Sequence, residues 1–348
     1  MRSGRLSVLA RWTAAAVALV VVARVGYGAE PPAEGKRISP WFVYKNEQSI
    51  ERLRPVADLI DSISVCGDAP ATFVAECHAL GMQVYKLVGG KPEAFDTEAH
   101  RQATIADYVR LCEGRGYDGI DLDFEGFDAS LRDAYGTLMR DASRELHRRG
   151  KKLSICVSYM MSTRRTAEAS RMGEFYDPAV IADTCDVVRV MCYDMYSLSG
   201  GAVGPVSTQP WAKDAMKYWM QHVPRERLVM GLPAYSGDFE LAVNGAEKRV
   251  YSDPAPDVPE GTAVQRVWLP YEQVNSYLYQ DADAHMHVYY ASDAASTRAH
   301  LETAERLGIT CIGFWHFEAV TPEMWDVVRT WHANGLADDA ASWWLVFP

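Results

Sequence analysis

Eight short runs rich in β-branched and aromatic residues recur along the 348-residue chain, with longer amphipathic segments between most of them. The runs occupy residues 38–44, 62–66, 83–88, 119–125, 152–158, 186–193, 228–233 and 310–315. Apolar residues in the segments between them, such as 97–114 and 130–149, recur at the helical spacings of three and four. This alternation predicts an α/β fold, a (β/α)8 TIM barrel, with a doubly wound open sheet as the structural alternative.

The spacing of the runs breaks once, between Pro233 and Thr310. The connection there is longer than the others, and it contains a loop rich in Pro and Asp at 252–261 and a helix-like piece at 270–279. We expect a small excursion between the seventh and eighth strands, on the face where barrel enzymes build their sites.

The two ends of the chain differ from the middle. Three Arg precede an apolar run at 12–23, and small residues follow it, which is typical of a cleaved secretory signal peptide at 1–29. The run is too short for a membrane-spanning helix of about 20 residues. We expect one domain over 30–337 and a secreted or periplasmic protein with no membrane contact after cleavage. The apolar tail 338–348 is expected to pack on the barrel or to bind another surface.

Composition and charge narrow the possible partners. The chain is 48% hydrophobic and 23% charged, as in ordinary soluble proteins, and its formal net charge of −11 becomes −15 without the first 29 residues and their four Arg. Such an acidic surface repels phosphate backbones, so nucleic acid is not an expected partner. The seven Cys form no C-x-x-C pair, which indicates neither a zinc knuckle nor a disulfide framework. We expect a monomer without metal or cofactor, in which Cys156, Cys192 and Cys311 behave as small hydrophobic residues.

The fourth run holds an unusual density of acids, reading D-G-I-D-L-D-F-E-G from Asp118 to Gly126. Side chains alternate along a strand, so Asp121, Asp123 and Glu125 share one face. The other face carries Ile120, Leu122 and Phe124. We expect the apolar set under the helices and the three acids inside the barrel, with Glu125 nearest its mouth. Three inward carboxylates cannot all ionise cheaply, so at least one should keep its proton near neutral pH, as a general acid must.

Two other interpretations fit this run less well. An EF-hand calcium loop requires a bidentate Glu at its twelfth position, where Arg132 stands, and it does not favour apolar residues between the ligands. A solvated acidic turn does not account for apolar residues that recur at a period of two.

The run D-G-I-D-L-D-F-E at 118–125 matches the DGxDxDxE signature of glycoside hydrolase family 18, the chitinase-like barrels, where it also forms the fourth strand. V-M-C-Y-D-M-Y at 190–196 resembles the sixth-strand motif of that family, and L-V-M-G-L-P-A-Y at 228–235 resembles its seventh strand. I-G-F-W at 312–315 is similar to the eighth strand, and 287–297 is similar to the segment before the last helix.

The resemblance implies a secreted hydrolase of β-1,4-linked N-acetylglucosamine glycans such as chitin oligosaccharides. In that family the acetamido oxygen of the substrate is the nucleophile, which gives retention of configuration. Glu125 would then act as general acid and base, and Asp123 would orient the acetamido group. Asp121 would share a proton with Asp123, and Tyr193 would hydrogen-bond the acetamido carbonyl. The remaining residues implied to bind substrate are Asp194, Met191, Trp315, Tyr44 and Tyr235, with Trp315 stacked under the sugar.

This chain also departs from the family pattern. Leu87 stands where the third-strand motif has a Ser that helps to hold the innermost acid, so Tyr44 or Ser158 would have to replace that hydroxyl. The excursion is shorter than the insertion domain of processive chitinases, which favours short oligosaccharides or glycan ends as substrates. Hydrolysis of peptidoglycan or of N-glycan cores remains an alternative within the same chemistry. A non-catalytic sugar-binding lectin on the same barrel is the alternative from another class.

Overall fold

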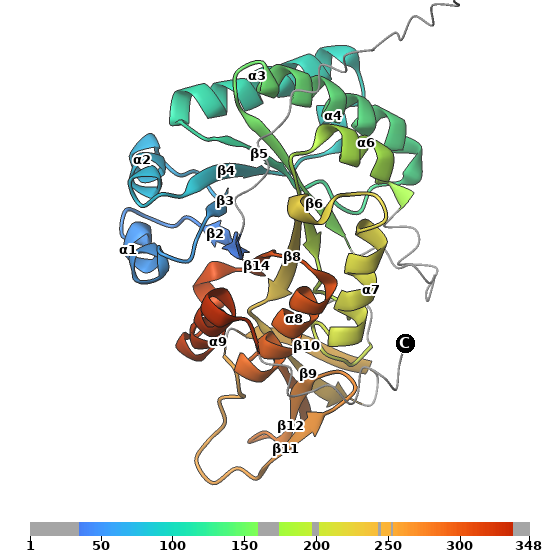
Figure 1. Ribbon diagram of the computed structural model, residues 1–348. Coiled ribbons are helices and arrows are strands. Elements are labelled where there is room, and N and C mark those ends of the chain that lie inside the picture. Colours follow the sequence, from blue (N-terminus) through green and yellow to red (C-terminus); the bar gives the residue numbers. More distant parts are fainter. Residues whose placement is uncertain (1–34, 159–173, 197–201, 243–244, 252, 337–348) are drawn as a thin grey trace, which may run out of the picture. The chain divides into compact units, whose positions relative to one another are not determined.

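Nine parallel strands form one sheet in the computed structural model, which describes residues 35–158, 174–196, 202–242, 245–251 and 253–336 (Figure 1). The strands are β1 (Arg37–Ile38), β2 (Trp41–Val43), β3 (Ser62–Cys66), β4 (Gln83–Val88), β5 (Gly119–Leu122), β6 (Lys152–Ser158), β7 (Val187–Met191), β8 (Leu228–Pro233) and β14 (Cys311–Trp315). Their order in the sheet is β1-β14-β8-β7-β6-β5-β4-β3-β2. All eight runs therefore contain a strand, although the first is divided in two.

The divided first strand closes the sheet into a barrel. β1 pairs with β14, and β2 pairs with β3, so the two halves contact opposite ends of the sheet. Between them, the Ser39 amide donates to the Ile312 carbonyl at 2.7 Å, and the Pro40 carbonyl accepts from the Ser64 amide at 3.0 Å. Pro40 has no N–H to donate, which is why the ladder is interrupted there. The expected TIM barrel is confirmed, with Pro40 as the interruption in its first strand.

Helices follow the strands of the barrel along the chain. The helices in the described part of the chain are α1 (Ser49–Leu53), α2 (Ala71–Ala79), α3 (Glu98–Arg115), α4 (Arg132–His147), α6 (Pro178–Thr184), α7 (Gln209–Trp219), α8 (Ala294–Leu307) and α9 (Pro322–Asn334). Several begin where a side-chain oxygen satisfies a free backbone amide, as Thr97 does for α3 and Asp293 for α8. No helix among the described residues has both the length and the apolar character that a membrane span requires.

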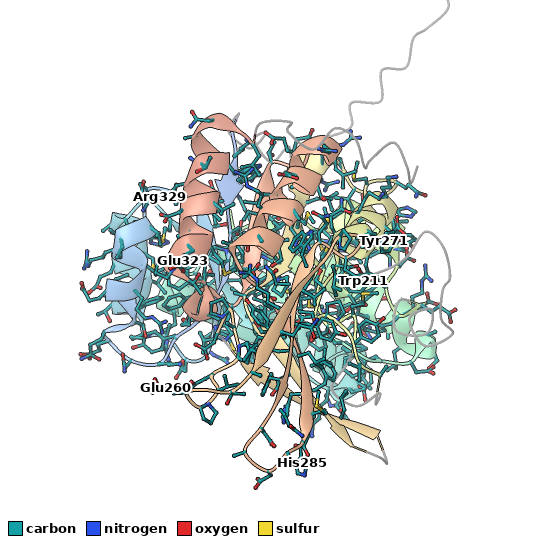
Figure 2. The ribbon with its side chains drawn as sticks, turned by 90° about the horizontal axis from the view of Figure 1, so that it is seen from below. Trp211, Glu260, Tyr271, His285, Glu323 and Arg329 are labelled. Carbon is teal, nitrogen blue, oxygen red and sulfur yellow. The ribbon has the colours of Figure 1, made fainter. Side chains whose placement is uncertain are left out.

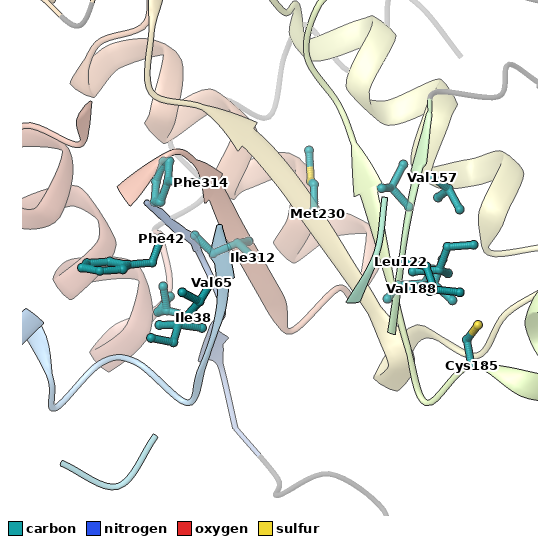
Figure 3. Packing of buried hydrophobic residues seen from close by; sticks show 14 of the residues in the cluster. Ile38, Phe42, Val65, Leu122, Val157, Cys185, Val188, Met230, Ile312 and Phe314 are labelled. Carbon is teal, nitrogen blue, oxygen red and sulfur yellow. The ribbon is translucent and has the colours of Figure 1, made fainter. Parts of the chain in front are cut away.

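Side chains that point outward from the strands form the main core with the helices. Figure 3 shows Phe42, Val65 and Phe314 together on one part of the sheet, and Leu122 and Val188 together on another. The side chains that point inward are more polar than those of an ordinary barrel. Buried polar residues on the inward face include Ser39, Ser62, Ser64, Asp121, Ser154 and Arg189. The barrel interior therefore needs its own hydrogen bonds and ion pairs.

The acidic run follows the alternation expected of it, but its strand is shorter. β5 ends at Leu122, and the Asp123 amide still donates to the Val88 carbonyl at 2.8 Å, so the chain leaves β4 just after Asp123. Ile120, Leu122 and Phe124 lie in the outer core, as predicted. Asp123 and Glu125 therefore follow the end of β5, where the chain reaches the C-terminal mouth of the barrel.

The excursion between β8 and β14 is a second sheet. Its strands are β9 (Ser236–Ala242), β10 (Gly245–Tyr251), β11 (Val264–Leu269), β12 (Val274–Gln280) and β13 (Met286–Ala291), antiparallel in the order β10-β9-β13-β12-β11. The helix predicted at 270–279 is wrong. The segment V-N-S-Y-L-Y-Q at 274–280 is instead a strand that pairs with a strand on each side. Figure 2 shows Tyr271 before β12 and His285 before β13, in turns at opposite ends of this sheet.

The expected signal peptide at 1–29 and the tail at 338–348 lie outside the described residues.

Gly119→Ala should destabilise the protein by roughly 1–3 kcal/mol, because overpacking in a tight core has costs of this size. A Cβ at Gly119 would lie 2.4 Å from the Lys152 carbonyl oxygen and 2.9 Å from the Tyr85 ring. Gly114→Ala in α3 is the matched control, since a Cβ there meets no atom within 4 Å. Urea denaturation should show the control unchanged or slightly more stable. Equal stability of the two variants would contradict this view of the β5 packing.

Candidate active site

Asp121 lies inside the barrel with its side chain fully buried. Its Oδ2 accepts a hydrogen bond from Ser64 Oγ at 2.5 Å and lies 3.2 Å from Nε of Arg189. The Cys156 thiol donates to the same oxygen at 3.5 Å. These partners come from β3, β7 and β6, so three strands hold one carboxylate. Charge-assisted contacts of this kind are what a buried anion requires.

Arg189 is as completely buried as its partner, and its guanidinium makes contacts across the barrel. Nε also lies 3.3 Å from Ser154 Oγ, and Nη1 donates to the Ser39 carbonyl at 2.8 Å. The guanidinium carbon lies 5.7 Å from the ring centroid of Trp41 and 5.6 Å from that of Tyr85. Cation–π contacts and the ion pair together compensate the charge that burial removes from water.

Asp123 follows on the same face and is partly exposed. Burial raises the pKa of its carboxyl to about 7, and the charges of Glu125 and Asp121 add to the effect. Asp123 therefore keeps its proton in the folded protein below about pH 7. This agrees with the expectation that the three acids do not all ionise.

Glu125 is the outermost of the three acids, and its side chain is open to solvent. Desolvation by the surrounding protein nevertheless raises the pKa of its carboxyl, and the charge of Asp194 raises it further. Exposure thus increases from Asp121 through Asp123 to Glu125, in the order expected for a row that ends at the mouth. We call these three residues the acidic column.

Three aromatic residues, which we call the aromatic cluster, lie beside the column. Trp41 and Tyr193 meet edge to face with ring centroids 6.0 Å apart, and Trp41 and Trp315 do so at 6.1 Å. The Trp41 indole donates to Cys156 Sγ at 3.2 Å, which joins the cluster to the partners of Asp121. Burial raises the pKa of the Tyr193 phenol, so its hydroxyl stays protonated and able to donate.

Asp194 and Tyr235 meet at the ends of β7 and β8. The Tyr235 hydroxyl donates to Asp194 Oδ1 at 2.5 Å, and the Asp194 backbone adopts φ 60°, a left-handed conformation that is uncommon for a residue with a side chain. Met191 is buried and packs in the same inner group as Trp41 and Tyr193. The structure thus brings Met191, Asp194, Tyr235, Tyr193 and Trp315 together around the acidic column.

Tyr44 is the predicted site residue that lies elsewhere. It follows β2 with the outward parity, and its ring meets Phe73 of α2 with centroids 5.0 Å apart. The aromatic residue of the first strand that points inward is Trp41, which the sequence analysis did not select. Strand alternation alone could have found it, since Trp41 and Val43 share a face and Tyr44 does not.

The two residues expected to replace the missing hydroxyl do not bond Asp121. Tyr44 lies outside the barrel, and Ser158 Oγ is buried without a hydrogen-bond partner in the described part of the chain. Leu87 stands opposite Asp121 in the register of β4 and β5 and packs in the inner group. The hydroxyl comes instead from Ser64.

Arg189 and Cys156 are the functional neighbours that sequence reasoning missed. Arg189 is two residues before Met191, so it shares the inward face of its strand, and a lone Arg in an apolar strand needs an acid as partner. The expectation that Cys156 is only a small hydrophobic residue needs correction, because its thiol donates to Asp121 and accepts from Trp41. All seven Cys are unbridged.

The geometry suits acid–base chemistry. A carboxylic acid at the mouth with a raised pKa can give a proton to a bound molecule, and the aromatic cluster offers apolar ring surface beside it. Within the described residues, no three His, Cys, Asp or Glu side chains are placed to hold a metal ion.

Asp123→Asn should stabilise the protein at about pH 8 by an amount on the order of 1–4 kcal/mol and much less at about pH 4. In the unfolded chain Asp123 loses its proton near the ordinary aspartate pKa of 3.8, whereas in the fold it keeps the proton up to about 7. The folded state therefore binds the extra proton, and stability falls as pH rises between these values. Urea denaturation at both pH values measures this, with the exposed Asp68→Asn as control. A variant no more stable than wild type at about pH 8 would contradict the assignment.

The sequences of curated relatives match only part of this chain. The cortical fragment-lytic enzyme of Bacillus subtilis is 24% identical over 237 residues, which cover 66% of this chain and 53% of that enzyme. The chain thus spans about half the length of that relative. Di-N-acetylchitobiase of Rattus norvegicus is 22% identical over 308 residues, which cover 78% of this chain and 82% of that protein.

Solved structures share the fold. A chitinase from Chromobacterium violaceum superposes with a TM-score of 0.72 at 16% identity, covering 85% of this chain and 98% of that one. The spore cortex-lytic enzyme of Bacillus cereus gives 0.72 at 16% identity, covering 85% and 74%. The family model for glycosyl hydrolases family 18 matches residues 75–319, which contain the acidic column and Trp315. The chain therefore belongs to glycosyl hydrolase family 18.

Proposed function

We propose that the protein hydrolyses β-1,4-linked N-acetylglucosamine glycans, with chitin oligosaccharides as substrates. The observation that supports this most is Glu125: an acid open to solvent, with a raised pKa, at the end of a column whose inner members are ion-paired or protonated. A glycosidase needs such a group to protonate the leaving oxygen. Membership of the family supplies the class of reaction.

In the proposed reaction, Glu125 donates its proton to the glycosidic oxygen as the bond to the anomeric carbon breaks. The acetamido carbonyl oxygen of the same sugar attacks that carbon and forms an oxazolinium ion. Water then attacks the anomeric carbon from the side the leaving group occupied, and Glu125 takes its proton. Two displacements at one carbon give net retention of configuration.

Other residues of the site position the substrate. The Tyr193 hydroxyl, which stays protonated, donates a hydrogen bond to the acetamido carbonyl oxygen. This hydrogen bond holds that oxygen near the anomeric carbon. Asp123, which is protonated when the reaction begins, orients the acetamido group, and the Glu125 carboxylate left after proton donation stabilises the positive charge of the oxazolinium ion. Trp315 presents a ring at the end of β14 to the apolar face of the sugar, and Asp194, Met191 and Tyr235 line the same subsite.

Hydrolysis of peptidoglycan, or of N-glycan cores, is the second candidate. The name of one relative, a cortical fragment-lytic enzyme, supports the peptidoglycan part of this candidate. A panel of chito-oligosaccharides, peptidoglycan fragments and high-mannose glycans separates these substrates. Release of reducing ends from chito-oligosaccharides well above the other two supports the first candidate, and preference for peptidoglycan replaces it with the second.

Export of the protein and a monomeric state are also proposals. The order of Arg, apolar and small residues in 1–29 supports export, and N-terminal sequencing of the protein recovered outside the cytoplasm tests it. A mature chain that begins at Met1 would refute cleavage, and light scattering would show a dimer if the monomer is wrong.

Glu125→Gln should lower kcat by at least about 100-fold on the preferred glycan while leaving binding within a few-fold, because the amide cannot donate the proton. Glu113→Gln, in the last turn of α3, is the matched control and should keep full activity. Turnover assays with isothermal titration calorimetry measure both quantities. Undiminished turnover in Glu125→Gln would refute the mechanism, and binding by a wild-type protein that hydrolyses no glycan would favour the lectin.

A further inference from the structure

The interior of the barrel holds a full positive charge directly beneath the acidic column. Arg189 and Asp121 are both 0% exposed, and their Nε and Oδ2 atoms lie 3.2 Å apart. Ser64 and Cys156 also direct their hydrogens to Oδ2. Asp121 Oδ1 and Asp123 Oδ1 are buried without a hydrogen-bond partner among the described residues.

We propose that Arg189 is a positioning residue for the reaction: it holds Asp121 as a carboxylate, so that the proton of the acidic column resides on Asp123. This inference rests on the proposed function, because it assigns the protonation state in which that reaction begins.

Three donors converge on one oxygen of Asp121, and each of them requires that oxygen to accept. A guanidinium remains protonated in proteins, so a neutral Asp121 would leave Arg189 as an unpaired charge with no access to water. The guanidinium is also fixed in place by Ser39, Ser154 and the faces of two aromatic rings. It therefore cannot turn away to another acid.

The arrangement differs from the one that the family resemblance implies, in which a neutral hydroxyl helps to hold the inner acid and the two Asp residues share a proton. Here Ser64 of β3 provides the hydroxyl in place of position 87, and a full charge on β7 lies against the acid in addition. An ionised Asp121 repels a second negative charge on Asp123, whereas a protonated Asp121 would not. Arg189 thus acts on Asp123 through Asp121.

The other titratable groups that interact with Asp121 or Arg189 are neutral at the pH values where Asp123 changes. Cys156 from β6 and Cys185 after α6 interact with Asp121, and Tyr85 from β4 and Cys311 from β14 interact with Arg189. Burial raises the pKa of each of these groups, that of Cys311 to about 11 and that of Cys185 to about 12. Glu125 is the remaining acid of the column, and its charge reaches Asp123 from the solvent side. Asp123 is therefore the inner group whose protonation is free to respond to Arg189.

Carboxyl ¹³C NMR of the full chain labelled at Asp tests this directly, over a titration from about pH 5 to about pH 8. Asp121→Asn and Asp123→Asn identify the two resonances. The Asp121 resonance should remain at a carboxylate position throughout, while that of Asp123 changes near pH 7. A wild-type Asp121 that is protonated in this range would overturn the proposal.

Arg189→Met should let Asp121 take up a proton, which moves the Asp123 transition to lower pH. Because Glu125 and Asp123 both begin the proposed reaction protonated, the alkaline limb of the kcat/KM profile should also move to lower pH. Arg189→Lys keeps the charge and should keep the transition near its wild-type position. Arg110→Met, an exposed Arg on α3, is the control that should change neither. An Asp123 transition that is unchanged in Arg189→Met, or equally displaced in Arg189→Lys, would overturn the proposal.

If Arg189→Met does not fold, the double variant Arg189→Met/Asp121→Asn removes both buried charges and provides the same comparison. Its Asp123 transition should again lie below that of wild type, and an unchanged transition would overturn the proposal. The titration needs no substrate. A protein inactive on every glycan would therefore refute the proposed function. An active enzyme in which the Asp123 transition is the same with and without Arg189 would refute this inference alone.

Discussion

A buried ion pair between Asp121 and Arg189 lies at the centre of the barrel. It determines which side chains the surrounding strands can direct inward. Removing one partner of such a pair leaves an uncompensated charge and costs roughly 3–5 kcal/mol. Several strands contribute to its compensation: β3 through Ser64, β6 through Ser154 and Cys156, β2 and β4 through aromatic rings, and the first strand also through the Ser39 carbonyl. The polar interior follows from this requirement.

The three acids of the column differ in burial and protonation from the interior of the barrel to its mouth. Asp121 is buried and ion-paired, Asp123 is partly buried and protonated below about pH 7, and Glu125 opens to solvent. Parallel strands all end at the same rim, so Tyr193, Asp194 and Trp315 reach the outer end of this column from strands that are distant in the sequence. In the proposed reaction, the inner acids set the charge of the column and the outer residues contact the substrate.

Much of this arrangement could be predicted from the sequence, because strand alternation and the spacing of eight runs are local features. The inward face of the acidic run belongs to that part, whereas the meeting of Met191, Asp194 and Trp315 was implied by the family resemblance. The partners of Asp121 could not, since Ser64 and Arg189 are far from it in the chain and pair only through the barrel register. The helix expected at 270–279 was wrong because a short apolar run is compatible with both the helical and the strand periodicity. Pairing with β11 and β13 makes this segment a strand.

The most direct test of a single acid working with the acetamido group of the substrate is the anomeric configuration of the first product. Proton NMR during early hydrolysis of a chito-oligosaccharide, before mutarotation, distinguishes the two anomers. Substrate-assisted attack predicts that the new reducing end appears first as the β anomer, because two displacements occur at one carbon. A product that appears first as the α anomer would contradict it, since water would then have displaced the leaving group in one step.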